Sequence, residues 1–199
     1  GAKTVLLYKL PASHTDEHVE AMLTALKTVD FDVLVYPYAK SGTGSSTAQQ
    51  TIATWIKSIQ DDEGKNVTVV LPNYTADSEY VINSVQGVTL SDGSNLTAYE
   101  TAAWIGGITA GASVTKSNTG QKFVGAIDVS PRMTRSEQET AIKAGKFLLD
   151  VDRSQNVTVV ADINSLTTTN QTKSDILKQN RSVRTACGIR SDIQSVWDA

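Results

Sequence analysis

The chain has 199 residues, 40% of them apolar, and a formal net charge of −3 from 18 basic and 21 acidic residues. This length and composition allow one ordinary domain with a substantial core, and they argue against intrinsic disorder. No segment is strongly basic and no apolar stretch approaches the thickness of a bilayer, so neither nucleic-acid binding nor membrane insertion is expected. The single cysteine, Cys187, cannot form an internal disulfide, which suits a reducing compartment.

The first third of the chain predicts strands alternating with helices. Residues 3–10 have the pattern of a strand, and residues 31–36, ended by Pro37, have that of a buried strand. Between them Thr15 is a plausible N-cap. The helix after it has apolar residues three or four positions apart: Val19, Met22, Leu23 and Leu26.

Residues 40–47 predict a flexible link, and Ser46 with Gln49 has the spacing of a capping box at the start of a second helix. The apolar stripe of that helix is Ala48, Ile52, Trp55, Ile56 and Ile59. A third buried strand is expected at residues 66–71. This order of elements favours a parallel sheet with right-handed crossovers.

The next segments predict a strand at residues 80–85, a turn at 91–94 and a helix capped by Thr97 and Glu100. This helix carries apolar residues beside a cluster of small ones: Gly106, Gly107, Ala110, Gly111 and Ala112. Glycine inside a helix costs about 1 kcal/mol relative to alanine. The cluster therefore indicates that another backbone packs close to this helix.

The last third predicts a helix capped by Thr134 and Glu137 and ended by Gly145. A hairpin of residues 147–151 and 157–161 is expected to follow, and then a helical C-terminus over residues 172–197. The apolar stripe of this last helix is Ala186, Ile189, Ile193 and Val196.

The resulting fold class is α/β, with α+β as an alternative: a mixed, partly parallel sheet flanked by helices, with a β-hairpin and a helical C-terminus. We expect a single core domain over residues 1–199, and a subdivision into 1–90 and 91–199 remains open.

One sequence pattern could hold a metal. His14, Glu17 and His18 match H-x-x-E-H, in which two histidines bind a metal and the glutamate acts as a base. In this chain the pattern spans a turn and the first turn of a helix, and no third histidine exists. A solvated helix start is therefore the favoured interpretation.

The Gly-rich loop at residues 41–47 lies between a strand and a helix, where phosphate-binding loops occur. It lacks the Lys-Ser/Thr of a P-loop and the third glycine of a dinucleotide fingerprint, so a surface linker is favoured. A small-molecule or nucleotide-binding module remains the alternative function.

Other reactive side chains have structural interpretations. Cys187 lies beside the apolar stripe of the last helix, and Asp128 is expected to be partly buried with a capping role. The tryptophans have helical apolar neighbours, which favours core packing: Trp55, Trp104 and Trp197. No G-x-S-x-G elbow is present. We therefore assign no catalytic, cofactor-binding or metal-binding residue and expect no cofactor.

A series of segments along the chain has a recognisable order and spacing: FDVLVYP (31–37), TWIKSIQDDEGKNVTVVL (54–71), YVINSVQGV (80–88), TAAWIGGITAGAS (101–113), residues 125–129, AIKAGKFLL (141–149), DINSLT (162–167) and NRSVRTACGIRSDIQSV (180–196). Taken in this order, these segments resemble the contractile tail sheath family of phages, prophages and phage-tail-like bacteriocins, over about residues 31–197. The most specific part is the W-I-x-G-x-x-A-G helix combined with the later D-I-N-S-L-T stretch.

The resemblance implies a structural subunit that is not an enzyme. Family members form hexameric rings stacked helically around a tail tube, and the sheath contracts to drive that tube through a target envelope. The implied partners are other copies of the chain, the tube protein, and baseplate and tail-terminator proteins. The implied location is a virion or tail-like particle, with assembly in the bacterial cytoplasm. Flexible terminal arms of the family add strands to neighbouring subunits.

Two features depart from the family pattern. The chain ends at Ala199, where members continue into a C-terminal domain and arm, and it lacks the β-rich domain that many relatives place near residues 10–15. The expectation is a rigid core without its N-terminal arm and C-terminal domain. The last helix is expected to expose three charges: Arg181, Arg184 and Arg190. They could contact a tube or a neighbouring subunit, although a solvated helix face is an equal alternative.

Overall fold

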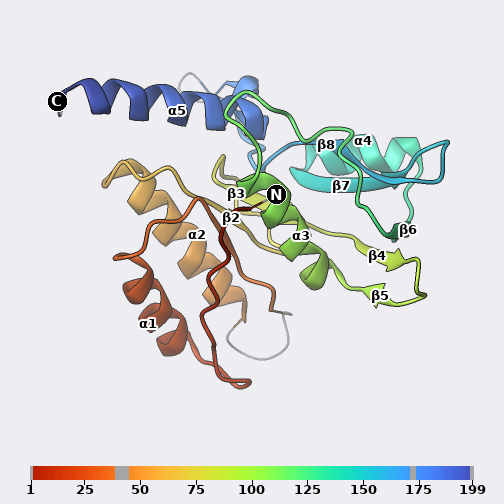
Figure 1. Ribbon diagram of the computed structural model, residues 1–199, viewed down its shortest axis with the longest axis horizontal. Helices are drawn as coiled ribbons and strands as arrows, with labels where there is room; N and C mark the ends of the chain where they lie inside the picture. Colours follow the sequence, from red (N-terminus) through yellow and green to blue (C-terminus); the bar gives the residue numbers. More distant parts are fainter. Residues whose placement is uncertain (1, 39–44, 171–173, 198–199) are drawn as a thin grey trace.

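The computed structural model describes residues 2–38, 45–170 and 174–197. Its centre is a five-stranded sheet in the order β1-β2-β3-β7-β8 (Figure 1). The strands are β1 (Val33–Val35), β2 (Thr68–Val70), β3 (Val81–Ser84), β7 (Lys146–Val151) and β8 (Val157–Ala161). The first four run parallel, and β8 pairs antiparallel with β7 as a hairpin. The predicted mixed α/β fold with a partly parallel sheet is confirmed.

Alternating side chains of the central strands bury against two separate layers. Val69 and Val81 point to the face covered by α1 (Asp16–Leu26) and α2 (Ser45–Asp61). Val70 and Ile82 point to the opposite face, which α3 (Ala98–Ala110) covers. Successive residues of a strand face opposite sides, so these near-continuous apolar runs produce two cores, as is usual for parallel strands.

A second, antiparallel sheet extends from the α3 side, in the order β5-β4-β6. Its strands are β5 (Asn95–Leu96), β4 (Gly87–Leu90) and β6 (Ala126–Ser130). The predicted turn at residues 91–94 connects β4 to β5. The sequence did not predict this sheet, because its strands are short and β4 and β6 are far apart along the chain.

Two of the helix starts predicted from capping boxes are confirmed. The Thr97 hydroxyl accepts a hydrogen bond from Glu100 N at 3.4 Å, and the Glu100 carboxylate accepts one from Thr97 N at 2.8 Å. Thr134 and Glu137 make the same reciprocal pair at the start of α4 (Arg135–Lys143). Each pair satisfies two backbone N–H groups that the helix itself leaves unpaired.

The predicted start of α2 is only partly right. Residues 39–44 of the expected link lie outside the described residues, and residues 45–47 already belong to the helix. Gln49 was expected to complete a capping box, but its side chain is buried and its amide donates to Pro72 O at 2.8 Å. That bond ties α2 to the end of β2.

Close packing against α3 is confirmed at one glycine. A Cβ at Gly106 would lie 2.3 Å from Val35 Cγ2 of β1, so the helix approaches the sheet more closely than alanine would allow. A Cβ at neighbouring Gly107 would meet nothing within 4 Å. The glycine cluster therefore reflects contact with the sheet on one side of α3 only.

Two predictions at the chain ends are wrong. Residues 3–10 form no strand: the segment is extended, and Val5, Leu6 and Leu7 are exposed because no neighbouring strand pairs with them in the described chain. The C-terminal helices η1 (Asp175–Lys178) and α5 (Asn180–Trp197) are present, but the apolar stripe of α5 faces solvent. Trp197, expected in the core, is 82% exposed.

The other two tryptophans pack as predicted. Trp55 of α2 stacks on Phe31 with ring centroids 6.4 Å apart, and Trp104 of α3 stacks on Phe123 at 4.3 Å.

Within the described ranges, no helix combines the length and apolar character that a bilayer crossing requires.

Candidate functional site

The D-I-N-S-L-T stretch, residues 162–167, begins directly after β8 and forms a buried polar junction. The Asp162 side chain is 1% exposed. Its Oδ2 accepts hydrogen bonds from Arg184 Nη2 and Asn118 N, both at 2.9 Å, and its Oδ1 accepts one from Asn180 Nδ2 at 2.8 Å. Asp162 N donates to Thr119 Oγ1 at 3.0 Å. One carboxylate therefore joins the end of β8, the segment before β6 and the start of α5.

The following residues fix this stretch to the sheet. Ser165 N donates to Val81 O of β3 at 2.7 Å, and Ser165 Oγ donates to Ser78 O at 3.1 Å. Asn164 Nδ2 donates to Leu177 O of η1 at 2.7 Å. The polar side chains of this stretch are all engaged in such bonds, so the stretch positions backbone segments rather than a reactant.

Arg190 makes a second polar contact between α5 and the core. Its Nη1 donates to Gln60 O at 3.1 Å, and its Nη2 donates to Gln60 Oε1 at 2.9 Å and to Gly64 O at 3.0 Å. Nη2 also donates to Asn66 Oδ1. We call the acceptors from Gln60, Gly64 and Asn66 the arginine cup. All of them are neutral groups.

The arginines of α5 were expected to be exposed, and for two of them this is wrong. Arg184 pairs with Asp162 and its side chain is 15% exposed, while Arg190 lies in the arginine cup. Arg181 is exposed, as expected. Their spacing on a helix does not reveal this difference, because the partners come from residues distant in sequence.

The thiol of Cys187 lies on the side of α5 that faces the arginine cup. The side chain is half-buried, and burial raises the pKa of the thiol. Raising the pKa lowers the thiolate fraction, which is the opposite of what a nucleophilic cysteine requires. The structural interpretation of Cys187 is therefore the better supported one.

The two histidines of the H-x-x-E-H pattern have separate structural contacts. His14 Nε2 lies 2.5 Å from the Tyr36 hydroxyl, and His18 Nδ1 accepts a hydrogen bond from Thr15 N at 3.1 Å. His18 is thus the N3 residue of a capping box whose N-cap is Thr15, at the start of α1, and Glu17 is exposed. Among the described residues, no group of three histidine, cysteine or acidic side chains is placed to share a metal ion.

Aromatic rings fill the carboxyl end of β1, where an α/β fold would bind a nucleotide. The His14 ring lies 5.8 Å from Tyr36 and 4.5 Å from Tyr38, measured between ring centroids. Burial raises the pKa of Tyr36 to about 12, so its hydroxyl stays protonated. Residues 41–44 of the Gly-rich loop lie outside the described residues, and the nucleotide-binding alternative stays a prediction.

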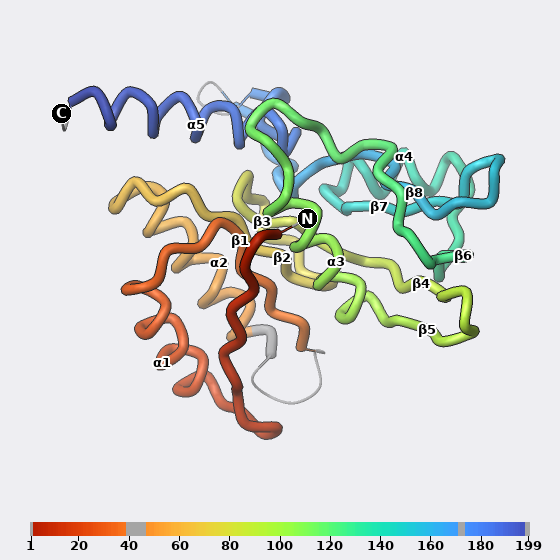
Figure 2. The backbone as a smooth tube through the Cα atoms, viewed as in Figure 1, coloured from red at the N-terminus to blue at the C-terminus, as the bar shows by residue number. Residues whose placement is uncertain are grey.

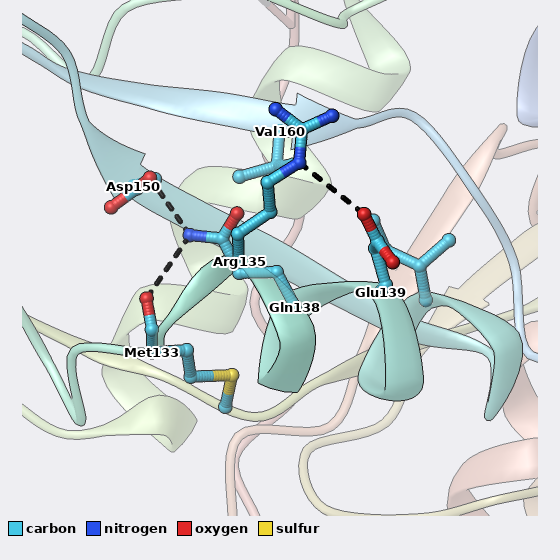
Figure 3. A pocket seen from close by; sticks show the side chains of 7 residues that line it. Met133, Arg135, Gln138, Glu139, Asp150 and Val160 are labelled. Carbon is cyan, nitrogen blue, oxygen red and sulfur yellow. Dashed lines mark hydrogen bonds and ion pairs between the residues drawn. The ribbon is translucent and has the colours of Figure 1, made fainter.

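An open groove of about 460 Å³ lies between α4 and the β7–β8 hairpin (Figure 3). Gln138 Nε2 crosses it, donating to Met133 O at 3.4 Å and Asp150 Oδ2 at 2.8 Å, and Arg135 pairs with Glu139 at the rim. These polar groups bond to one another. Nothing in the groove combines a nucleophile with a base.

Asp128 was expected to cap an element, and the structure places it in strand β6 instead. Its Oδ1 accepts hydrogen bonds from Arg132 Nε and Val129 N, both at 2.7 Å. The Arg132 hydrogen bond is the main cause that lowers the pKa of this carboxyl. Asp128 is ionised and paired, which is unsuited to acid–base work.

A second carboxylate, Asp77 between β2 and β3, also fixes residues after β8. Its Oδ1 accepts hydrogen bonds from Thr168 N at 2.8 Å, Thr167 N at 2.7 Å and Thr167 Oγ1 at 2.9 Å. These bonds, chiefly the backbone bond from Thr168, hold the pKa of Asp77 far below its ordinary value. Asp77 has a φ of +46°, which aspartate and asparagine tolerate best after glycine.

Asp77→Asn should lower the free energy of unfolding near neutral pH. In acid the difference from the wild type should disappear. Because the folded-state pKa is lowered, the ionised group stabilises the fold above its unfolded-state pKa of about 3.9, and the benefit falls as the pH drops below that value. The gap in urea midpoint between wild type and variant should therefore narrow below about pH 4. A gap independent of pH would contradict this. Asp62→Asn, in an exposed turn, is the control.

Comparison with known proteins places this fold in a family. A sequence profile of the phage tail sheath protein central domain matches residues 12–165. The crystal structure of a sheath tail protein from Desulfitobacterium hafniense is similar with a TM-score of 0.87 and 35% identity, covering 94% of this chain and 44% of that one. The tail sheath protein of Clostridium phage phiCD119 is 29% identical over 92% of this chain and 49% of its own length.

A more distant likeness concerns the fold alone. The helical sheath of the anti-feeding prophage in its contracted state has a TM-score of 0.65 and 15% identity, covering 94% of this chain and 53% of that one. The chain spans 36% to 49% of the length of the curated relatives that it matches. With a matching profile over more than half of its residues, the chain belongs to the phage tail sheath protein family and contains that family's central domain.

Proposed function

We propose that this chain is the rigid core of a contractile tail sheath subunit. Copies of the subunit would polymerise as stacked hexameric rings around a tail tube, and contraction of the stack would drive the tube through a target envelope. The observation that carries the proposal is the match of the sheath central domain to residues 12–165. The likeness in fold to a contracted helical sheath supports it.

The proposed partners are other copies of the subunit, the tube protein, and baseplate and tail-terminator proteins, in a virion or tail-like particle assembled in the cytoplasm. We also propose that the subunit is not an enzyme. The carboxylates, histidines and thiol described above support this, because their contacts are structural. In this mechanism the work comes from a metastable assembly rather than from a reaction.

We propose residues 1–199 as one core domain rather than two. Strands β1, β2 and β3 precede residue 90 and strands β7 and β8 follow it, yet all five belong to one sheet. The parallel pairing of β3 with β7, and the bond from Ser165 N to Val81 O, cross the same boundary. A division at residue 90 would leave both parts with unpaired central strands.

Electron microscopy of the full-length protein tests the proposed function. We expect rings, tubes or sheath-like polymers at high protein concentration. Circular dichroism and a cooperative urea transition would establish that the protein is folded. A folded protein that stays dispersed at every concentration, with and without its tube protein, would overturn the proposal.

A further inference from the structure

Helix α5 contacts the core mainly through polar atoms. Of its residues, only Asn180 and Val183 are buried. Its large apolar side chains face solvent instead, with exposed fractions between 55% and 82%: Ile189, Ile193, Val196 and Trp197. In Figures 1 and 2 the last turns of α5 extend beyond the rest of the molecule. A helix held without an apolar interface lacks the usual source of tertiary helix stability.

The two polar contacts of α5 differ in charge balance. Arg184 lies against the buried carboxylate of Asp162, which neutralises it. Arg190 has only the neutral acceptors of the arginine cup. Both arginines have a buried Nε with no hydrogen-bond partner in the described chain, so the counter-ion is what distinguishes them. A desolvated charge without a counter-ion regains hydration when it leaves its site, which favours release.

The backbone between these two contacts has a weak point. Gly188 lies between Arg184 and Arg190, and glycine is the poorest helix former after proline. A Cβ at Gly188 would lie 3.1 Å from Val114 Cγ1, so a larger residue would crowd this contact. On either side of Gly188, Asn66 Nδ2 donates to Cys187 O at 3.0 Å and to Ser191 Oγ at 2.5 Å, which are again polar contacts with the 60–66 segment.

We propose that residues 187–197 of α5 form a latch, which releases from the arginine cup and rebinds while the rest of the fold stays intact. The Asp162–Arg184 pair is the fixed pivot, and Gly188 is where the helix bends. Opening changes the direction in which the exposed apolar side chains of the last two turns of α5 point. Local openings of this kind occur where few apolar contacts hold a segment. The inference does not depend on the proposed function.

Hydrogen–deuterium exchange of the 199-residue chain, followed by mass spectrometry of peptides, tests the latch. Arg190→Gln should speed exchange in residues 187–197 at least roughly tenfold, the effect of losing a hydrogen bond to a charged group. Exchange in β2, β3 and residues 180–186 should not change. Arg190→Lys keeps the charge but loses the planar guanidinium with its several N–H donors. It should therefore speed exchange in the same residues. Arg181→Gln, exposed on the same helix, is the matched control.

Cys187 gives an independent readout, because it is the only thiol of the chain. Its reaction with a disulfide reagent should be faster in Arg190→Gln than in Arg181→Gln, although Arg190 itself lowers the pKa of this thiol. Two results would overturn the latch: exchange in 187–197 that tracks global unfolding across urea concentrations, or equal rates in the Arg190→Gln and Arg181→Gln variants. The first result would show that α5 unfolds only with the core, and the second would show that the arginine cup does not hold residues 187–197.

Discussion

Replacing Asp162 with alanine should destabilise the fold by about 3–5 kcal/mol, because breaking a buried ion pair leaves an uncompensated charge. The side chain of Arg184 would keep only Lys116 O as an acceptor, and Asn180 Nδ2 and Asn118 N would lose theirs. Domains of this size are stable by only about 5–15 kcal/mol, so the loss is a large share of the total. Urea denaturation followed by circular dichroism measures it.

The Asp128–Arg132 pair is the matched control. The two side chains are 42% and 61% exposed, so Asp128→Ala should cost less than about 1 kcal/mol. Replacing Asp162 with leucine and Arg184 with methionine together should recover much of the loss, since neither partner is then left charged and buried. The assignment of Asp162 as the central group of the junction fails if the two alanine variants have the same urea midpoint.

Much of the fold could be predicted because its signals are local. The capping boxes at Thr97 and Thr134 lie within three residues of their partners, and β1 and β2 lie in nearly continuous apolar runs. The hairpin of β7 and β8 needs only a short turn. Each of these patterns reports a structure that forms among neighbours in sequence.

The polar junction could not be predicted in the same way. Arg190 and Gln60 are 130 residues apart, and Arg184 and Asp162 are 22 apart, so no local pattern links either pair. An arginine on a helix is read as solvated unless its partner is known. The D-I-N-S-L-T stretch supplied one available signal: consecutive polar residues directly after a buried strand have to find hydrogen-bond partners if they are buried too.

For the arginines exposure was predicted and burial was found. For the apolar residues at both ends of the chain the error is the reverse, since burial was predicted and exposure was found. Residues 3–10 and the stripe of α5 have the patterns of a strand and of a packed helix, yet all of these residues except Leu10 face solvent. A hydrophobic pattern indicates that a surface is suited to burial, and it does not say which segment will cover it. This distinction separates the core that the described chain completes from the apolar surfaces that it leaves exposed.

The stretch after β8 also depends on a close backbone approach, which Gly145→Ala should disrupt. Gly145 connects α4 to β7 with a φ of +70°, and a Cβ there would lie 2.8 Å from the carbonyl carbon and oxygen of Ser165. The left-handed backbone costs a non-glycine residue about 1–2 kcal/mol, and overpacking adds about 1–3 kcal/mol. We expect a loss of about 2–5 kcal/mol, measured by urea denaturation.

Gly120→Ala separates the two contributions. Gly120 has a similar φ of +78°, and a Cβ there would meet nothing within 4 Å, so only the backbone cost of about 1–2 kcal/mol applies. The difference between the variants measures the contact of Gly145 with Ser165. Equal losses would mean that Ser165 moves away without cost. Because Ser165 N bonds to Val81 O of β3, a larger loss for Gly145→Ala would show that the sheet holds this stretch in place against the α4–β7 connection.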